Sequence, residues 1–221
     1  MLRLLLGPLL ITLSVIAAHA QTVSPADIKA LLARVREKRV TAPNLQAEFQ
    51  EQRKVHLLDE PIVSSGKVWS QSPNKFRREV KGNSPSVMIS DGQQFWIYYP
   101  KFNSAEHYSL IRRSPLNAAL AAINTALNLE NVENTFHISG TKIEAGYELE
   151  LLPKTPSMRR IFQRLDIRIN NELSVMRTDM LQPNGDRIVT TYTNQQSSPI
   201  PPTIFEFTPP PGTEVTMPMG K

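Results

Sequence analysis

Apolar and polar residues alternate with a period of two over most of the chain, which is the pattern of β-strands that bury one face and expose the other. Turn-forming Gly, Pro, Asn and Asp residues separate the alternating segments. The segments are LQAEFQEQRK from 45, GKVWSQS from 66, KFRREV from 75, SVMIS from 86, QFWIYY from 94 and AEHYSL from 105, followed by FHISG, YELELL, IFQRLDIRIN, LSVMRTDML, RIVTTYT and TIFEF. We expect about eleven or twelve antiparallel strands.

Two segments carry a helical period instead. The stretch Ser24-Pro25-Ala26-Asp27 supplies an N-cap hydroxyl, a first-turn proline and an early acid. An amphipathic helix over about 25–39 is predicted from the apolar stripe that follows, formed by Ile28, Leu31, Leu32 and Val35. Ser114-Pro115 repeats the cap signature and opens a second amphipathic helix, whose apolar face is formed by Leu116, Leu120, Ile123 and Leu127.

The strand in SDGQQFWIYYP, residues 90–100, is apolar or aromatic on both faces. If Asp91-Gly92 forms a two-residue turn, Met88 pairs with Phe95. One face then carries Met88, Phe95, Ile97 and Tyr99, and the other carries Val87, Ile89, Trp96 and Tyr98. Both faces need cover, so we expect a half-closed barrel with a helical lid. The alternative is a filled barrel or sandwich core that uses the same residues.

The first twenty residues have the form of a secretory signal peptide. They hold one Arg, an apolar run and the small-residue ending Ala18-His19-Ala20, which predicts cleavage before Gln21. An uncleaved membrane anchor is the alternative, but the apolar run is shorter than the roughly 20 residues of a bilayer span. We therefore expect 1–20 to be a signal peptide and 21–221 to be one exported, soluble domain.

The absence of cysteine and the positive charge narrow the class of protein. A chain without cysteine has no disulfide, no metal thiolate and no lipidation site, and disulfide-free export fits a bacterial periplasm. The net charge is +5 at pH 7. An exported protein does not meet nucleic acid, so we expect no nucleic-acid partner. The positive charge is then expected to serve solubility or attraction to anionic membrane surfaces.

Motifs for catalysis and metal binding are missing from the sequence. His56, His107 and His137 have no metal-ligand spacing, and there is no G-x-S-x-G elbow, Walker A loop or dinucleotide fingerprint. Asp91 precedes a glycine and is expected to be a turn residue. The sequence thus predicts a protein that is not an enzyme and that holds no metal and no cofactor.

Three stretches, GKVWSQSPNKF, SVMISDGQQFWIYYP and FEFTPPPGTEV, resemble the LolA family of periplasmic lipoprotein carriers. The resemblance is clearest over 45–110 and 203–215. It implies an incomplete antiparallel β-barrel of about eleven strands closed by a helical lid. It also implies a monomer whose apolar cavity holds the acyl chains of a lipoprotein between the inner and outer membranes. The implied partners are an inner-membrane lipoprotein-releasing ABC transporter and an outer-membrane lipoprotein receptor.

The resemblance also selects site residues. The cavity-facing pattern of the family falls on Val68, Phe76 and Met88, and we add the strand residues Phe95, Ile97 and Tyr99. The lid residues implied are Leu116, Leu120 and Ile123. In the family an Arg that takes part in opening and closing precedes the proline of the Pro-x-x-Phe turn, whereas this chain has Ser72 there. Either Arg77 or Arg78 could replace that Arg.

The departure at Ser72 leaves the cargo open. The chain is expected to be a lipoprotein carrier, and the alternative is a LolA-like carrier of another amphiphile. A periplasmic lipid-sensing module and a lipid hydrolase are further alternatives. The first would need a second domain, which we do not expect here, and the second would need a nucleophile and a base, which the sequence motifs do not supply.

Overall fold

The computed structural model describes residues 21–110, 129 and 132–218. Strands dominate this part of the chain. The strands are β1 (Gln21–Thr22), β2 (Asn44–Lys54), β3 (Ile62–Gln71), β4 (Lys75–Lys81), β5 (Ser86–Ser90), β6 (Gln94–Tyr99), β7 (Ser104–Ser109), β8 (Phe136–Ile143), β9 (Gly146–Pro153), β10 (Arg164–Asn170), β11 (Val175–Leu181), β12 (Arg187–Gln196) and β13 (Glu214–Thr216). The helices are α1 (Pro25–Thr41), α3 (Val132–Thr135) and α4 (Pro156–Arg159), with 3-10 turns η1 (Pro100–Phe102) and η2 (Pro202–Phe205).

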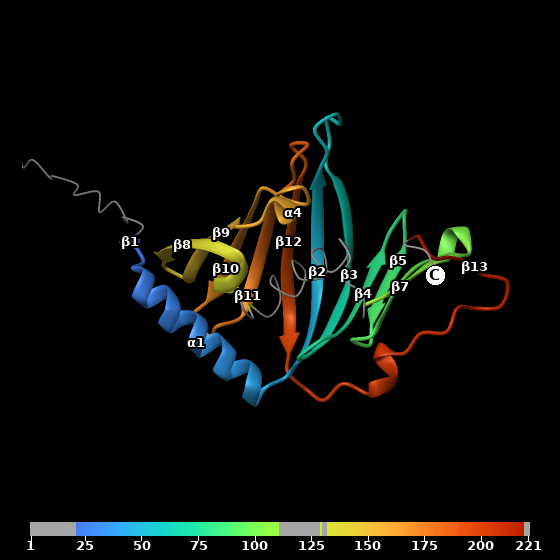
Figure 1. Ribbon diagram of the computed structural model, residues 1–221, viewed down its shortest axis with the longest axis horizontal. Coiled ribbons are helices and arrows are strands. Elements are labelled where there is room, and N and C mark those ends of the chain that lie inside the picture. Colours follow the sequence, from blue (N-terminus) through green and yellow to red (C-terminus); the bar gives the residue numbers. More distant parts are fainter. Residues whose placement is uncertain (1–20, 111–128, 130–131, 219–221) are drawn as a thin grey trace, which may run out of the picture.

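All the described strands belong to one open sheet. Their order is β1-β8-β9-β10-β11-β12-β2-β3-β4-β5-β6-β7-β13, so β1 and β13 form the two edges. Neighbouring strands are antiparallel apart from β13, which runs parallel to β7. Figure 1 shows the sheet twisting across the molecule, with α1 along the end that holds β8 to β11. The fold is therefore the incomplete barrel that the sequence predicts.

Helix α1 has the N-terminal cap and the buried apolar stripe that the sequence predicts. The Ser24 hydroxyl accepts a hydrogen bond from the Asp27 amide at 3.2 Å, and Pro25 occupies the first turn. The helix buries the expected stripe, namely Ile28, Leu31, Leu32 and Val35. These four side chains join the same buried cluster as the sheet, so α1 closes one end of the core.

The two faces of the sheet differ in what covers them. We call the inner face the one that carries Phe49, Val68, Phe76, Leu149 and Ile167, because these residues share the buried cluster with α1. Cross-strand partners lie on the same face, so the ladder pairs assign every other residue of each strand to it. The main core of the protein is the inner face of β2 to β4 and β8 to β12.

The backbones of β3 and β4 approach each other closely at Gly66. A Cβ atom at this position would lie 1.8 Å from the Glu79 carbonyl oxygen and 2.8 Å from the Phe49 ring. A side chain at this position would collide with both groups, so only glycine fits. Gly66 thus allows β3 and β4 to approach each other here while the Phe49 ring packs against them.

The outer face of β4 to β7 is covered by the segment that follows β12. In Figure 1 this segment, drawn in red, passes along the edge of the molecule and returns to place β13 beside β7. The Phe207 ring lies 5.5 Å from Trp96 and 5.5 Å from Tyr98. Ile89 and Phe205 are each 1% exposed. This cover explains why the second face of the β5–β6 hairpin is apolar.

Eleven of the predicted strands correspond to β2 through β12. The prediction of a strand over TIFEF was wrong, because residues Pro202–Phe205 form η2. The short edge strands β1 and β13 were not predicted. The predicted signal peptide and the predicted lid helix lie outside the described residues. No helix of the described part is long and apolar enough to cross a membrane.

Candidate functional site

The inner face of β3 to β6 brings the predicted cavity residues together. Phe76 pairs with Ser90, which pairs in turn with Phe95, and Met88 pairs with Ile97. Val68 lies opposite Arg78, in the cross-strand row that continues to Met88 and Ile97. All six residues proposed for the cavity therefore share one face, which is completed by Tyr99.

The register of the β5–β6 hairpin differs from the prediction. Met88 pairs with Ile97, not with Phe95, because four residues rather than two lie between Ser90 and its partner Phe95. The Asp91 carboxylate accepts hydrogen bonds from the Gln93 amide at 2.8 Å and the Gln94 amide at 2.7 Å, which stabilises the longer turn. The shift is an even number of residues, so the predicted grouping of faces is unchanged.

The six residues of this face differ in burial. Val68 and Phe76 are 1% and 2% exposed and belong to the main buried cluster. Phe95 is also buried, and its ring lies 6.1 Å from that of Tyr108. Met88, Ile97 and Tyr99 are only half-buried. We call these three residues the apolar patch, because they are the members of the set that keep accessible surface.

A charged pair lies on the inner face beside the apolar patch. The Arg78 guanidinium is 2.5 Å from the Glu51 carboxylate and stacks over the Phe49 ring, 4.0 Å from its centroid. The Thr190 hydroxyl donates to the same carboxylate at 3.4 Å. Arg77 points to the outer face, where it contacts Glu79 and the Ile204 carbonyl. Of the two arginines considered as replacements for the family's Arg, only Arg78 is therefore on the inner face.

A second polar cluster lies on the other side of the apolar patch. Glu106 accepts hydrogen bonds from the Tyr99 hydroxyl, at 3.3 Å, and from the Tyr108 hydroxyl. Burial, followed by the hydrogen bond and charge of Glu106, raises the pKa of both Tyr99 and Tyr108. Both tyrosines are consequently neutral donors at physiological pH.

Ser72 lies in the turn between β3 and β4. Its amide donates a hydrogen bond to the Pro43 carbonyl at 3.0 Å, and the residue is half-buried. This hydrogen bond ties the β3–β4 turn to the connection between α1 and β2. The lid residues Leu116, Leu120 and Ile123 lie outside the described residues.

Sequence reasoning missed Glu106, Tyr108 and the Arg78–Glu51 pair. The segment AEHYSL was interpreted only as a strand, although Glu106 and Tyr108 are two residues apart and therefore share a face. That spacing could have indicated the cluster. The Arg78–Glu51 contact joins strands that are not sequence neighbours, so no local signal predicts it.

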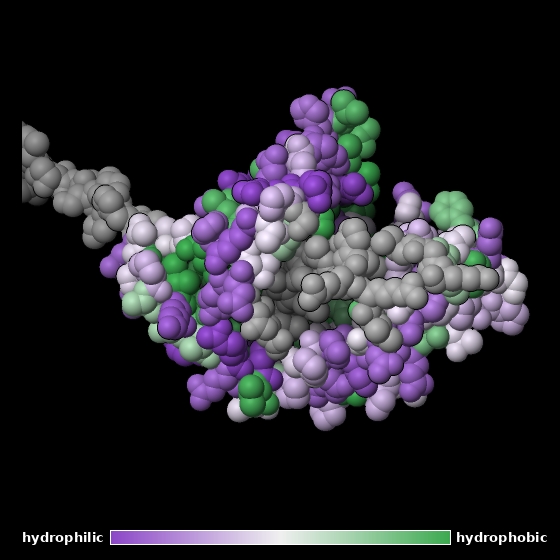
Figure 2. All heavy atoms as spheres, in the orientation of Figure 1, coloured by the Kyte–Doolittle hydropathy of each residue, from purple (hydrophilic) through white to green (hydrophobic). Residues whose placement is uncertain are grey.

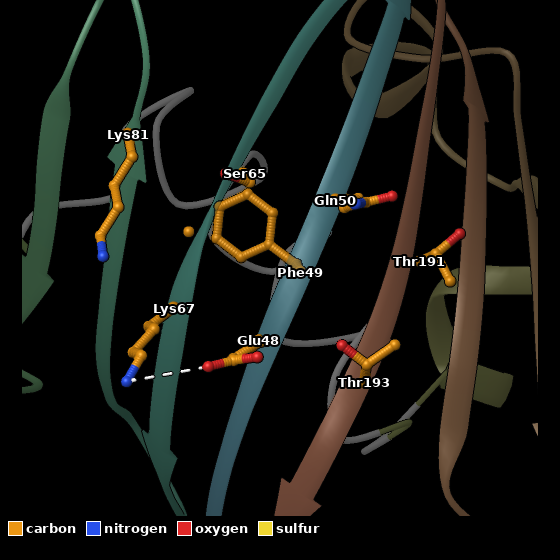
Figure 3. Close-up of a pocket in the computed structure, with 9 residues that line it drawn as sticks. Glu48, Phe49, Gln50, Ser65, Lys67, Lys81, Thr191 and Thr193 are labelled. Carbon is orange, nitrogen blue, oxygen red and sulfur yellow. Dashed lines mark ion pairs between the residues drawn. The ribbon is translucent and has the colours of Figure 1, made fainter.

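A polar groove of about 390 Å³ lies on the outer face across β12, β2, β3 and β4 (Figure 3). Phe49 and Gly66 complete a lining of polar side chains, which are Glu48, Gln50, Ser65, Lys67, Lys81, Thr191 and Thr193. The Lys67 ammonium is 3.9 Å from the Glu48 carboxylate. Such a lining suits water rather than acyl chains.

Exposed apolar residues gather at the tip of the β2–β3 hairpin, where Figure 2 shows hydrophobic side chains. They are Leu57, Leu58, Ile62 and Val63, of which Leu57 is 88% exposed. The tip is far along the strands from the apolar patch. Among the described residues there is no group of three or more His, Cys, Asp or Glu side chains that could hold a metal ion.

Comparison with known proteins assigns the family. The family model "Outer membrane lipoprotein carrier protein LolA" matches residues 41–208. The outer-membrane lipoprotein carrier protein of Erwinia tasmaniensis is 27% identical over 150 residues, which cover 68% of this chain and 70% of that protein. The carrier protein of Serratia proteamaculans is 26% identical over 147 residues, covering 66% and 68%.

A solved structure supports the fold. The crystal structure of an uncharacterized conserved protein from Thermus thermophilus has a TM-score of 0.53 at 12% identity, and the match covers 86% of this chain and 99% of that one. At this identity the likeness shows the fold alone. The family model spans β2 through η2, the part of the chain that builds the inner face. The chain therefore belongs to the LolA family of outer membrane lipoprotein carrier proteins.

Proposed function

We propose that this protein is a periplasmic carrier that shields the acyl chains of lipoproteins on the inner face of its sheet and moves them from the inner to the outer membrane. Membership of the LolA family supports carriage. The single observation that supports the location of the cargo is the apolar patch, because Met88, Ile97 and Tyr99 are apolar surfaces left half-buried next to a filled core.

The physical basis is the transfer of hydrocarbon out of water. Each CH₂ group of an acyl chain that leaves water contributes about 0.8 kcal/mol, so a bound chain is shielded without any input of energy by the carrier. Release then requires an acceptor site of higher affinity. We propose that cargo is received from an inner-membrane lipoprotein-releasing ABC transporter and delivered to an outer-membrane lipoprotein receptor. The carrier acts as a monomer without a catalytic step.

Export of the protein is part of the proposal. Residues 1–20 would direct it to the periplasm, with cleavage before Gln21. Two observations support that site: the Ala18-His19-Ala20 ending, and the pairing of Gln21 with Lys142 in β8, which gives the new N-terminus a place in the sheet. N-terminal sequencing of the exported protein should return Gln21. An intact Met1 terminus in the membrane fraction would contradict cleavage.

Charge placed in the apolar patch tests the site. Met88→Glu and Ile97→Glu should each abolish binding of a fluorescent fatty acyl probe, because a carboxylate on the patch must be desolvated when a chain covers it. Leu57→Glu is the matched control: it makes the same kind of change at a residue that is 88% exposed and far from the patch. Its binding should equal that of the wild type.

Thermal melting of each variant shows whether it is folded. Binding that survives both patch changes in folded protein would contradict the proposed location. Equal loss of binding in the Leu57→Glu control would show that the probe does not report on the inner face. The Phe76→Glu change is unsuitable, because Phe76 is 2% exposed in the main core and its replacement would unfold the domain.

A further inference from the structure

Glu106 is a half-buried carboxylate held by two hydroxyl donors. Tyr99 and Tyr108 both donate to it, from β6 and from its own strand β7. Hydrogen bonds to a charged carboxylate are stronger than those between neutral groups. The two tyrosines therefore hold the Glu106 carboxylate at a defined place on the inner face.

The Glu106 carboxylate has no cationic partner among the described residues. The ion pairs found there include the inner-face pair of Arg78 with Glu51 but none that involves Glu106. The contrast between the two carboxylates is informative, since both lie on the same face and both are partly buried. Glu51 has a cationic partner in Arg78, whereas the described residues provide no cation for Glu106.

The position of Glu106 relates it to the proposed cargo site. Ile97 of the apolar patch pairs directly with Glu106 across the β6–β7 ladder. Directly opposed residues of an antiparallel pair have their Cβ atoms about 5 Å apart. A molecule whose hydrocarbon covers Ile97 can therefore place a polar group beside the Glu106 carboxylate.

We propose that Glu106, Tyr99 and Tyr108 form a subsite for a cationic group, such as a protonated amine, next to the acyl chains of the cargo. The carboxylate supplies the opposite charge, and the tyrosine rings supply aromatic surface of the kind that attracts cations. An anionic head group at the same place would be repelled. The inference rests on the proposed function, because it assumes that hydrocarbon lies on the apolar patch.

The test uses two fluorescent probes with the same hexadecyl chain, one with a primary ammonium head and one with a carboxylate head. The wild type should bind the ammonium probe about fivefold more tightly, as expected for a partly exposed ion pair. Glu106→Gln keeps the shape of the side chain and should make the two affinities equal. Glu48→Gln, which removes an exposed carboxylate from the outer face, should retain the preference.

Salt provides a measurement that needs no variant. The preference of the wild type for the ammonium probe should shrink as the ionic strength rises, because salt screens a partly exposed charge. Equal affinities in the wild type, an unchanged preference in Glu106→Gln or a preference insensitive to salt would each overturn the subsite. Failure of the wild type to bind either probe would instead contradict the proposed function.

Discussion

Met88 and Ile97 lie directly opposite each other in the β5–β6 ladder. The same cross-strand row continues to Arg78 in β4 and to Glu106 in β7. The half-buried Met88 and Ile97 side chains thus lie between Arg78 and Glu106. Arg78 is paired with Glu51, whereas the described residues provide no cation for Glu106. This arrangement suits a ligand with hydrocarbon and a polar end.

Substitutions at Phe76 and Ile97 should distinguish the core of the protein from its binding surface. Phe76→Ala is expected to lower the free energy of unfolding by about 3 kcal/mol, because it leaves a cavity in the main core. Ile97→Ala should cost about 1 kcal/mol or less at its half-buried site, while it weakens binding of an acyl probe. Urea denaturation and probe titration measure the two effects. Equal loss of stability would mean that Ile97 is core.

Gly66 should not tolerate a side chain. Gly66→Ala places a methyl group against the Glu79 carbonyl and the Phe49 ring, so we expect a loss of about 3 kcal/mol or failure to fold. Ser65→Ala, at the exposed neighbouring position, is the control and should be nearly neutral. A stable Gly66→Ala variant would show that β3 and β4 are less closely apposed.

Ionisation of the Tyr99 and Tyr108 hydroxyls should lower the free energy of unfolding, and it should do so only at alkaline pH. Burial, then Glu106, raises the pKa of both hydroxyls above the ordinary 10.0. Because the folded pKa is the higher one, the stabilisation is complete below the unfolded pKa and is lost as the pH rises through the folded values. Glu106→Gln removes the carboxylate but not the burial, so both tyrosines should titrate at lower pH in that variant. Ultraviolet titration of tyrosinate measures this, and identical curves would contradict it.

Ser72 is the position at which we expect the chain's release properties to depart from those of its family. Ser72→Arg should change the rate at which a bound acyl probe passes to an acceptor, because the residue is half-buried in the β3–β4 turn and is not part of the core. The melting temperature should stay nearly unchanged. Unchanged transfer would mean that release is controlled elsewhere, and a large loss of stability would mean that the turn is packed inside the core.

Local periodicity and capping were sufficient to predict much of the fold. The alternating segments became β2 through β12, and the cap at Ser24 begins α1 at Pro25. These features depend on residues that are close in sequence. The inner and outer faces of the β5–β6 hairpin were also predicted, because side chains alternate from one face to the other along a strand.

Features that depend on tertiary contacts were not predicted. The turn after Ser90 is longer than two residues because the Asp91 carboxylate accepts two amides, and the sequence DG alone does not reveal this. TIFEF alternates like a strand, but prolines at 201, 202 and 209 restrict its backbone pairing, and Phe207 packs on Trp96 and Tyr98 instead. The edge strands β1 and β13 are too short to show a period.

The most direct test of the central claim is native mass spectrometry of the protein purified from its own periplasm, together with its Ile97→Glu variant. The claim that acyl chains bind on the inner face predicts additional masses of acylated protein on the wild type and their depletion in the folded variant. Wild-type protein that carries no acylated partner, or equal amounts of partner on the wild type and the variant, would contradict it.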